Sequence, residues 1–157
     1  MLALYLTSVQ RYLPQKDLLK FCTENGIHLM AHQPLGGNPV GVVAPRAHIP
    51  GPLKDEKVLE IASRNHITPA LVLLSWAVQR GTSVVPKSVH PDRIRSNLQI
   101  FALSDADFEA VDNLRSEEES VRYLDPRFHI GFNIFSEVAD EPVGDVVFVG
   151  AAGKGDP

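Results

Sequence analysis

Residues 68–86 combine a nearly apolar helix with an apolar strand that follows it after one turn. The segment TPALVLLSWAVQRG begins with Thr68 as N-cap and Pro69 at the first helical position, and Gly81 ends it. Its side chains leave little polar face, which predicts a helix that is buried on most sides. The residues TSVVP then read as a short buried strand. A buried helix that passes directly into a buried strand indicates an α/β fold.

The same succession occurs earlier in the chain. The segment LPQKDLLKFCTENG predicts a helix that stops at Gly26, and IHLMAH follows it as a buried strand that ends before Pro34. We expect Leu18, Phe21 and Cys22 to lie on one face of this helix, with Leu19 beside them. Two such units favour a parallel sheet. Ligands of parallel sheets bind beyond the carboxyl ends of the strands, which here are followed by HQPLGG and PKSVHPDR.

Three further helices are predicted. In LKDEKVLEIASRNH, Asp55 can cap the helix, and the apolar stripe comprises Val58, Leu59, Ile61 and Ala62. In SDADFEAVDNL, Ser104 is the N-cap with Asp107 three residues on, and the buried stripe comprises Phe108, Val111 and Leu114. A short helix starts at Pro91.

Two stretches resist assignment to regular structure. Residues 34–52 are dense in proline and glycine, and two interpretations stay open: a loop over a functional site, or a disordered insertion. After Leu114 come acidic residues, then the aromatic-rich RYLDPRFHIGFNIF. We therefore expect one domain over residues 1–140 and a flexible tail over residues 141–157.

Charge and cysteine content exclude several classes of function. A formal net charge of −4, from 15 basic and 19 acidic residues, argues against binding to nucleic acid or to a membrane surface. The single cysteine, Cys22, excludes an internal disulfide framework and a zinc site of several cysteines. It favours a reducing, cytoplasmic location. The opening MLALYLTSV lacks a basic leader and is too short to cross a bilayer, so we expect neither a signal peptide nor a membrane span.

The segment VVPKSVHPDRIRSN concentrates positive charge just after the second predicted strand. Lys87 and Ser88 lie where the chain leaves the sheet, the next helix begins at Pro91, and Arg93 follows in its first turn. A lysine, a hydroxyl, a helix N-terminus and an arginine together suit a phosphate group. A solvated turn explains the same residues, and the spacing does not decide between the two.

Other chemistries find less support. His28 and His32 fall on one face of a strand, but no third ligand is evident, so no metal is expected. Ser75 lies within the buried helix and Cys22 on a helix face, which makes both structural. No G-x-S-x-G elbow is present, no G-x-G-x-x-G follows a strand, and there is no P-loop.

The order of these segments resembles that of a known family. LPQKDLLKFCTENGI, AHQPLGG, TPALVLLSWAVQRGTSVVPKSVHPDRIRSN and LSDADFEAVDNL resemble the C-terminal half of an aldo-keto reductase, from about Tyr12 to Leu114. The resemblance implies part of a (β/α)8 barrel that binds NADPH without a Rossmann domain. It also implies an NADP-dependent oxidoreductase that reduces small aldehydes or ketones to alcohols by hydride transfer.

The resemblance assigns cofactor contacts to nine positions. Lys87, Ser88 and Arg93 match the residues that hold the 2′-phosphate of NADPH. The other matches are Val89 as a neighbouring backbone contact, Asn97 at the adenine, His32 at the nicotinamide, and Pro34, Leu35 and Gly36 over the pyrophosphate. Lysine and arginine favour NADP over NAD, because a 2′-phosphate needs donors rather than an acidic partner.

This sequence also departs from the family pattern. His32 stands where the family has a tyrosine that stacks on the nicotinamide, so ring stacking is expected to be less extensive. Ser96 stands where the family often has an acidic residue at the adenine. LYLTSVQR lacks the family's glutamine, glutamate and His-Pro pair, so no nicotinamide-amide contact is expected from that strand.

The largest departure concerns catalysis. The family's catalytic Asp, Tyr, Lys and His come from the N-terminal half of its barrel and have no counterpart among these residues, so we assign no catalytic residue and expect the chain alone to be inactive. Three hypotheses remain: a truncated aldo-keto reductase, a non-catalytic half-barrel that binds nucleotide or a partner chain, and self-association of two halves. A partial barrel is expected to expose strand edges and apolar helix faces.

Overall fold

The computed structural model describes residues 3–8, 12–36 and 50–114. Most of the Pro- and Gly-rich stretch at 34–52, the aromatic-rich segment after Leu114 and the predicted tail at 141–157 lie outside the described residues.

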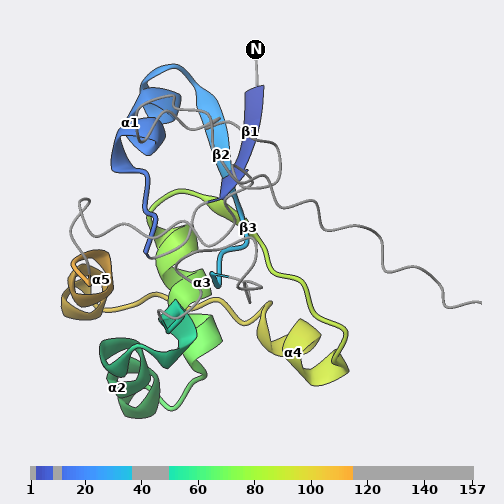
Figure 1. Cartoon of the computed structure of the whole chain (residues 1–157), viewed down its shortest axis with the longest axis vertical. Coiled ribbons are helices and arrows are strands. Elements are labelled where there is room, and N and C mark those ends of the chain that lie inside the picture. Colours follow the sequence, from blue (N-terminus) through green and yellow to red (C-terminus); the bar gives the residue numbers. More distant parts are fainter. Residues whose placement is uncertain (1–2, 9–11, 37–49, 115–157) are drawn as a thin grey trace, which may run out of the picture.

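A parallel sheet forms the centre of the described part (Figure 1). Its strands are β1 (Ala3–Ser8), β2 (Ile27–His32) and β3 (Ser83–Val85), in the order β1-β2-β3. Both neighbouring pairs are parallel, and their registers bring Ser8, His32 and Val85 level with one another across the sheet. The predicted parallel sheet is therefore confirmed, and its carboxyl ends share one edge.

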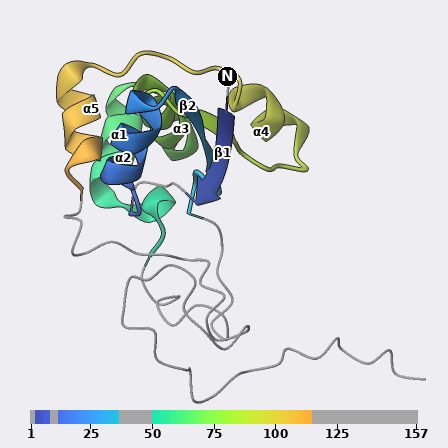
Figure 2. The same cartoon turned by 90° about the horizontal axis from the view of Figure 1, so that it is seen from above.

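The helices divide into a packed group and one that stands apart. Their bounds are α1 (Lys16–Glu24), the 3₁₀ helix η1 (Pro52–Lys54), α2 (Glu56–Arg64), α3 (Pro69–Gln79), α4 (Pro91–Ser96) and α5 (Asp105–Asp112). In Figures 1 and 2, α1, α2, α3 and α5 lie to one side of the strands, and α4 lies away from all four.

Three helix starts predicted from the sequence are confirmed by their caps. The side chain of Asp55 accepts a hydrogen bond from the backbone N–H of Lys57 at 3.0 Å. Thr68 Oγ1 accepts from the N–H of Leu71 at 3.2 Å, and Ser104 Oγ accepts from the N–H of Asp107 at 3.2 Å. Each cap satisfies one of the backbone donors that a helix start leaves free.

The helix ends follow the predicted glycines. Gly26 and Gly81 have φ of 66° and 93°, in the left-handed region where a side chain would be strained. The chain can therefore reverse after α1 and α3 and enter β2 and β3 at once.

The main core surrounds α3. All seven residues from Leu71 to Ala77 are buried, which confirms the prediction of a helix with little polar face. The cluster that packs around it comprises Val58, Ile61, Ala62, Val72, Leu73, Trp76, Ala77, Leu103 and Val111. The core thus draws on α2, α3 and α5, with the chain at Leu103 closing one side.

Two apolar positions contradict the predicted stripes. Phe21 on α1 and Leu59 on α2 are 57% and 44% exposed. At roughly 100° of rotation per residue, each lies about 100° from the centre of the buried face of its own helix. The elements that pack on each helix cover only the centre of its apolar stripe: β2 contacts α1, while α3 and α5 contact α2. Phe21 and Leu59, at the margins of these stripes, therefore stay exposed.

A buried carboxylate joins α2 to α5. Asp107 is only 4% exposed, forms an ion pair with Arg64 and accepts a 3.1 Å hydrogen bond from Nδ2 of Asn65. Burial opposes ionisation of this carboxyl, but the hydrogen bonds from Asn65 and Arg64 outweigh it and hold the pKa of Asp107 below its ordinary value. The fold therefore favours the charged form of this group.

A second polar contact links Tyr12, which precedes α1, to Asp55, the N-cap residue of α2. The hydroxyl of Tyr12 donates to Oδ2 of Asp55 at 2.6 Å, and Tyr12 itself is 2% exposed. Asp55 uses its other oxygen, Oδ1, to cap α2. One carboxylate therefore holds both a helix start and a tyrosine that is 43 residues away in sequence.

Candidate functional site

The two segments that carry the candidate residues leave the sheet side by side. His32, the last residue of β2, is the register partner of Val85, the last residue of β3. The chain therefore enters Gln33 and Pro86 from neighbouring points at the carboxyl edge of the sheet. This confirms the predicted placement of both segments, and it is the edge at which ligands of parallel α/β sheets bind.

The first segment is a tight turn. Gln33 has φ of 55° and Gly36 has φ of 83°, and the N–H of Gly36 donates to the carbonyl of Gln33 at 2.9 Å. Pro34 and Gly36 are buried, Leu35 packs against the α3 core, and His32 is exposed. The packing of Pro34, Leu35 and Gly36 therefore fixes the turn, while the imidazole of His32 is exposed to solvent.

Gln33 is a position that the sequence did not single out. A residue other than glycine at positive φ costs on the order of 1 kcal/mol, so such strain marks a turn that the surroundings impose. No local signal in AHQPLGG shows that Gln33 carries this conformation.

The second segment holds two cations without carboxylate partners. Lys87 and Arg93 are both exposed, and neither forms an ion pair within the part of the chain that the structure describes. Arg95 differs, since its Nη1 lies 3.5 Å from Oδ1 of Asp92. The positive charge of Lys87 and Arg93 is therefore free for an anionic ligand.

Ser88 lies between these cations in sequence. Its Oγ accepts a hydrogen bond from the N–H of His90 at 3.1 Å, so the hydroxyl proton can still be donated elsewhere. Two cations and a hydroxyl donor are the groups that bind phosphate oxygens.

Helix α4 begins at Pro91, as predicted, but adds little to anion binding by itself. It has only six residues and carries Asp92 in its first turn. The N-cap residue, His90, makes no capping hydrogen bond through its side chain. The attraction for an anion therefore depends on the side chains of Lys87, Ser88 and Arg93.

The remaining candidate residues lie along the same segment. Val89 is 72% exposed, and Asn97 follows α4 with its N–H donating to the carbonyl of Arg93 at 2.9 Å. The backbone of Asn97 is thus tied to the arginine, and its side chain is half-buried.

The histidine pair on β2 does not form a metal site with other described residues. His28 Nε2 and Ser83 Oγ are hydrogen-bonded at 2.6 Å, whereas His32 lies exposed at the end of the strand. Over residues 3–8, 12–36 and 50–114, no group of three His, Cys, Asp or Glu side chains could hold a metal ion.

The two nucleophilic side chains have structural surroundings. Ser75 is fully buried, and its Oγ accepts a hydrogen bond from the N–H of Phe101 at 3.3 Å. Cys22 is buried in a small cluster with Leu29 and Ala31. Both placements support the structural interpretation of these residues.

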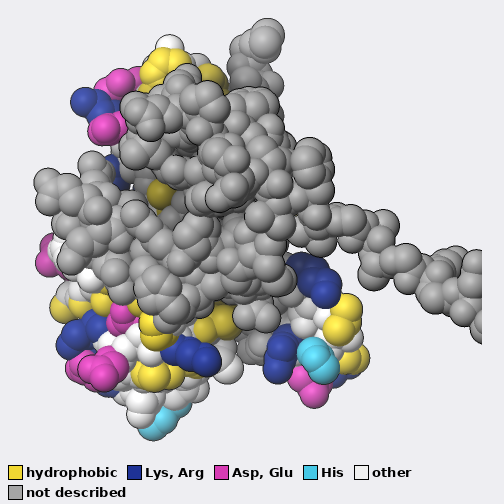
Figure 3. Space-filling view, viewed as in Figure 1, with side chains coloured by type: hydrophobic (Ala, Val, Ile, Leu, Met, Phe, Trp, Pro, Cys, Tyr) yellow, Lys and Arg dark blue, Asp and Glu magenta, His cyan; other side chains and the backbone are white. Residues whose placement is uncertain are grey.

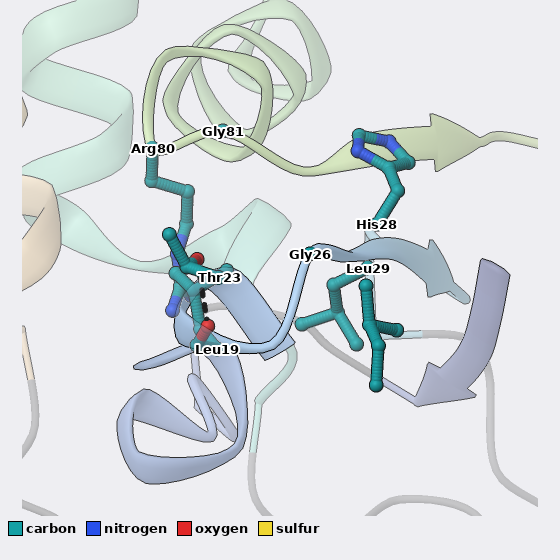
Figure 4. Close-up of a pocket in the computed structure, with 8 residues that line it drawn as sticks. Leu19, Thr23, Gly26, His28, Leu29, Arg80 and Gly81 are labelled. Carbon is teal, nitrogen blue, oxygen red and sulfur yellow. Dashed lines mark hydrogen bonds between the residues drawn. The ribbon is translucent and has the colours of Figure 1, made fainter. Parts of the chain in front are cut away.

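A hollow of about 400 Å³ lies at the opposite end of the sheet (Figure 4). Gly26 and His28 at the start of β2, together with Gly81 before β3, contribute to its wall, and Arg80 reaches across from α3 toward α1. Because it adjoins the amino ends of the strands, this hollow is separate from the candidate residues.

Arg80 is a half-buried cation that the sequence did not reveal. Its guanidinium carbon lies 4.6 Å from the ring centroid of Trp76, and its Nη1 is buried without a hydrogen-bond partner. Burial lowers the pKa of Arg80, and the negative charge of Asp112 opposes that shift. The contact with the aromatic face compensates part of the cost of burying the charge.

Known proteins resemble this chain over the described region. The model of the Aldo/keto reductase family matches residues 3–116. The chain is 42% identical over 116 residues to glycerol 2-dehydrogenase (NADP(+)) of Saccharomyces cerevisiae, covering 74% of this chain and 34% of the yeast protein. It is 40% identical over 126 residues to D-galacturonate reductase of Hypocrea jecorina, covering 76% of this chain and 37% of that protein.

A solved structure shows the same likeness in three dimensions. The crystal structure of a Gox0644 mutant in complex with NADPH has a TM-score of 0.62 and 27% sequence identity. The alignment covers 74% of this chain and 40% of the Gox0644 chain.

Parallel strands linked by helices, with candidate ligand residues at their carboxyl edge, define an α/β protein with part of a β/α barrel. The chain belongs to the aldo/keto reductase family. It spans about a third of the length of the curated relatives that it matches. None of the helices within the described ranges is both long and apolar enough to cross a membrane.

Proposed function

We propose that this chain is the NADP(H)-binding, C-terminal portion of an aldo-keto reductase, with Lys87, Ser88 and Arg93 holding the 2′-phosphate. The observation that carries this proposal is the pair of unpartnered cations, Lys87 and Arg93, that flank a free hydroxyl donor beyond the carboxyl end of β3. The name of the yeast relative specifies NADP(+), and the Gox0644 mutant was solved with NADPH, which supports the choice of cofactor.

The other candidate residues have roles along the rest of the cofactor. Pro34, Leu35 and Gly36 form the turn that would lie over the pyrophosphate, with Val89 and Asn97 toward the adenine end. His32 would stack on the nicotinamide from its exposed place at the tip of β2. An imidazole ring offers a smaller stacking surface than a phenol ring, so we expect weaker ring contact than a tyrosine would give.

The reaction of the whole protein would be reduction of a small aldehyde or ketone to an alcohol. Bound NADPH supplies the hydride. The residues of this chain bind the phosphate, fix the backbone over the pyrophosphate and orient the ring. No residue of this sequence matches the family's general acid, so this chain alone is expected to bind cofactor without turning over substrate.

Substitution of Arg93 tests the cofactor assignment. Arg93→Ala should weaken NADPH binding by at least about tenfold, because a charge-assisted contact contributes on the order of 1.5–3 kcal/mol. NADH, which lacks the 2′-phosphate, should bind the variant and the original chain about equally. Titration of the cofactor's fluorescence measures both affinities.

Arg95→Ala is the matched control. Arg95 lies two residues further along α4 and is already paired with Asp92, so its loss should change NADPH affinity less than about threefold. Equal losses of NADPH and NADH affinity in Arg93→Ala would remove the 2′-phosphate assignment.

A non-catalytic half-barrel is the second candidate, because the family's catalytic residues have no match in this sequence. An assay of NADPH consumption with an aldehyde tests the absence of turnover that both candidates expect of this chain alone. Turnover well above buffer would show that the chain carries a general acid that we have not assigned.

A further inference from the structure

The hollow at the amino ends of the strands lies between α1 and the turns that lead into β2 and β3. Its volume of about 400 Å³ is large enough for a small organic molecule. Leu19 and Ile27, both half-buried, give it apolar walls, and Arg80 is the single Lys or Arg side chain among the residues that line it. Apolar walls with one cation suit a ligand that has a short apolar body and one negative charge.

No carboxylate forms an ion pair with Arg80 in the described part of the chain. The negative charge of Asp112 acts on it, but Oδ2 of Asp112 lies 2.9 Å from Nζ of Lys16, and Oδ1 accepts from Nε1 of Trp76 at 3.1 Å. Nη1 of Arg80 is buried and has no hydrogen-bond partner among the described residues. Burial lowers the pKa of Arg80 by more than the charge of Asp112 raises it, so the charged guanidinium is only partly compensated.

The position of this guanidinium differs from that of the cations on α4. In Figure 3, the Lys and Arg side chains around α4 stand on the surface, where water solvates their charge. Arg80 instead lies over the ring of Trp76 and extends from α3 toward Thr23 and Leu19 of α1 (Figure 4). It has already lost part of its hydration in the fold, so an anion that pairs with it displaces little further water.

We propose that the hollow binds a monocarboxylate with a short apolar body, whose oxygens accept hydrogen bonds from Arg80 while the body lies against Leu19 and Ile27. A guanidinium presents paired donors that match the two oxygens of a carboxylate. A phosphate dianion would bring a second charge that the hollow does not compensate, and it offers nothing to the apolar walls. The site is separate from Lys87 and Arg93, which follow the carboxyl end of β3, so it does not depend on the proposed function.

Hexanoate is the probe, and it is titrated into the full 157-residue chain. Trp76 reports binding, because it is the only tryptophan and the guanidinium carbon of Arg80 lies 4.6 Å from its ring centroid. We expect a saturable change in its fluorescence with a Kd on the order of 1 mM, in line with the affinity per atom of small ligands. 1-Hexanol, which has the same apolar body without the charge, should bind at least about tenfold more weakly. Inorganic phosphate should give no saturable change.

Thr23→Glu tests the site while Arg80 stays in place. Thr23 is exposed on the α1 side of the hollow, so a carboxylate at this position should pair with Arg80 and take the place of the ligand. This variant should lose the response to hexanoate. Thr23→Gln is the matched control, because it has the same size without the charge, and it should bind hexanoate within about threefold of the original chain. Thr23→Glu should also melt about 2–4 °C higher than Thr23→Gln.

Arg80→Gln removes the cation and should weaken hexanoate binding at least about tenfold. Arg80 also packs on Trp76, so far-ultraviolet circular dichroism checks that this variant folds, and Thr23→Glu decides the test if it does not. Arg93→Ala should bind hexanoate as the original chain does, because Arg93 lies on α4, away from the hollow.

Three results would overturn the proposal. Equal affinity for hexanoate and 1-hexanol would show that the hollow selects only an apolar body. An undiminished response to hexanoate in Thr23→Glu, together with a melting temperature no higher than that of Thr23→Gln, would show that Arg80 does not hold the carboxylate. Loss of hexanoate binding in Arg93→Ala would place the anion at the other edge of the sheet.

Discussion

Helices α3 and α4 flank the same strand and begin with the same local signal, yet they belong to different environments. Each has proline at its first position, Pro69 in α3 and Pro91 in α4. From Leu71 to Ala77 every residue of α3 is buried, whereas no residue of α4 is. The comparison shows that helix-start signals establish where a helix begins, and that neighbouring elements determine whether it contributes to stability.

The two helices also divide stability and ligand chemistry between them. α3 carries the core residue Trp76, and α4 carries Arg93, which has no carboxylate partner among the described residues. A buried helix holds its side chains firmly, and an exposed one leaves its charges available to a ligand. This division predicts that substitutions in α3 change the free energy of unfolding, while substitutions in α4 change binding.

The largest effect is expected at the centre of α3. Trp76→Ala removes a fully buried indole that donates from Nε1 to Asp112 at 3.1 Å, and it should lower the free energy of unfolding by about 3–5 kcal/mol. Leu98→Ala, just beyond α4, should change it by less than about 0.5 kcal/mol. Urea unfolding of both variants is followed by far-ultraviolet circular dichroism. Tryptophan fluorescence does not serve here, because Trp76 is the only tryptophan and one variant lacks it. Similar losses would remove the contrast between the two helices.

An intermediate effect is expected where α5 joins α2. Asp107→Asn removes the ion pair with Arg64 and should cost about 1–3 kcal/mol at neutral pH. The pKa of Asp107 is held below its ordinary value of 3.8, so its contribution is fully present above that pH and is lost as pH falls through the lower, folded-state value. The original chain and Asp107→Asn should therefore converge in stability under acid conditions.

Urea midpoints between about pH 2 and pH 7 test that convergence. Glu109→Gln, an exposed carboxylate on the same helix, is the control and should shift the midpoint little at any pH. A difference between the original chain and Asp107→Asn that persists undiminished in acid would contradict the assigned pKa direction.

The smallest effect concerns the caps of the two helices. Thr68→Ala removes the hydroxyl that accepts from Leu71 and should cost about 1 kcal/mol. His90→Ala at the start of α4 should cost no more than a few tenths of a kcal/mol, because that side chain makes no capping hydrogen bond. Thermal melts of the two variants give the comparison. A larger loss in His90→Ala would show that α4 is more tightly integrated than its exposure indicates.

Local chemistry explains which parts of the fold were predictable. Thr68, Asp55 and Ser104 mark helix starts through hydrogen bonds that span two or three residues, so the sequence alone reveals them. The contact between Arg64 and Asp107 joins residues 43 apart, and no local pattern indicates it. The exposure of Phe21 and Leu59 likewise depends on the width of the neighbouring surface, which periodicity does not supply.

The candidate site divides in the same way. The motif PKSVHPDR and the strand order bring Lys87 and the turn after His32 to one edge, as the sequence predicted. The pairing of Arg95 with Asp92, which leaves Arg93 free, could have been suggested from the i, i+3 spacing of opposite charges. The positive φ of Gln33 could not, because that conformation is imposed by packing around the turn.

The two oxygens of Asp55 also affect how this protein can vary. Tyr12 and the first turn of α2 both form hydrogen bonds with the carboxylate of Asp55. The position of α2 therefore depends on Tyr12 as well as on the segment that joins Gly36 to Pro50. Because each doubling of loop length costs only about 0.6 kcal/mol, insertions into that segment should leave the core nearly as stable. We therefore expect insertions in this connection to be tolerated, and substitution of Tyr12 or Asp55 alone to disturb the start of α2.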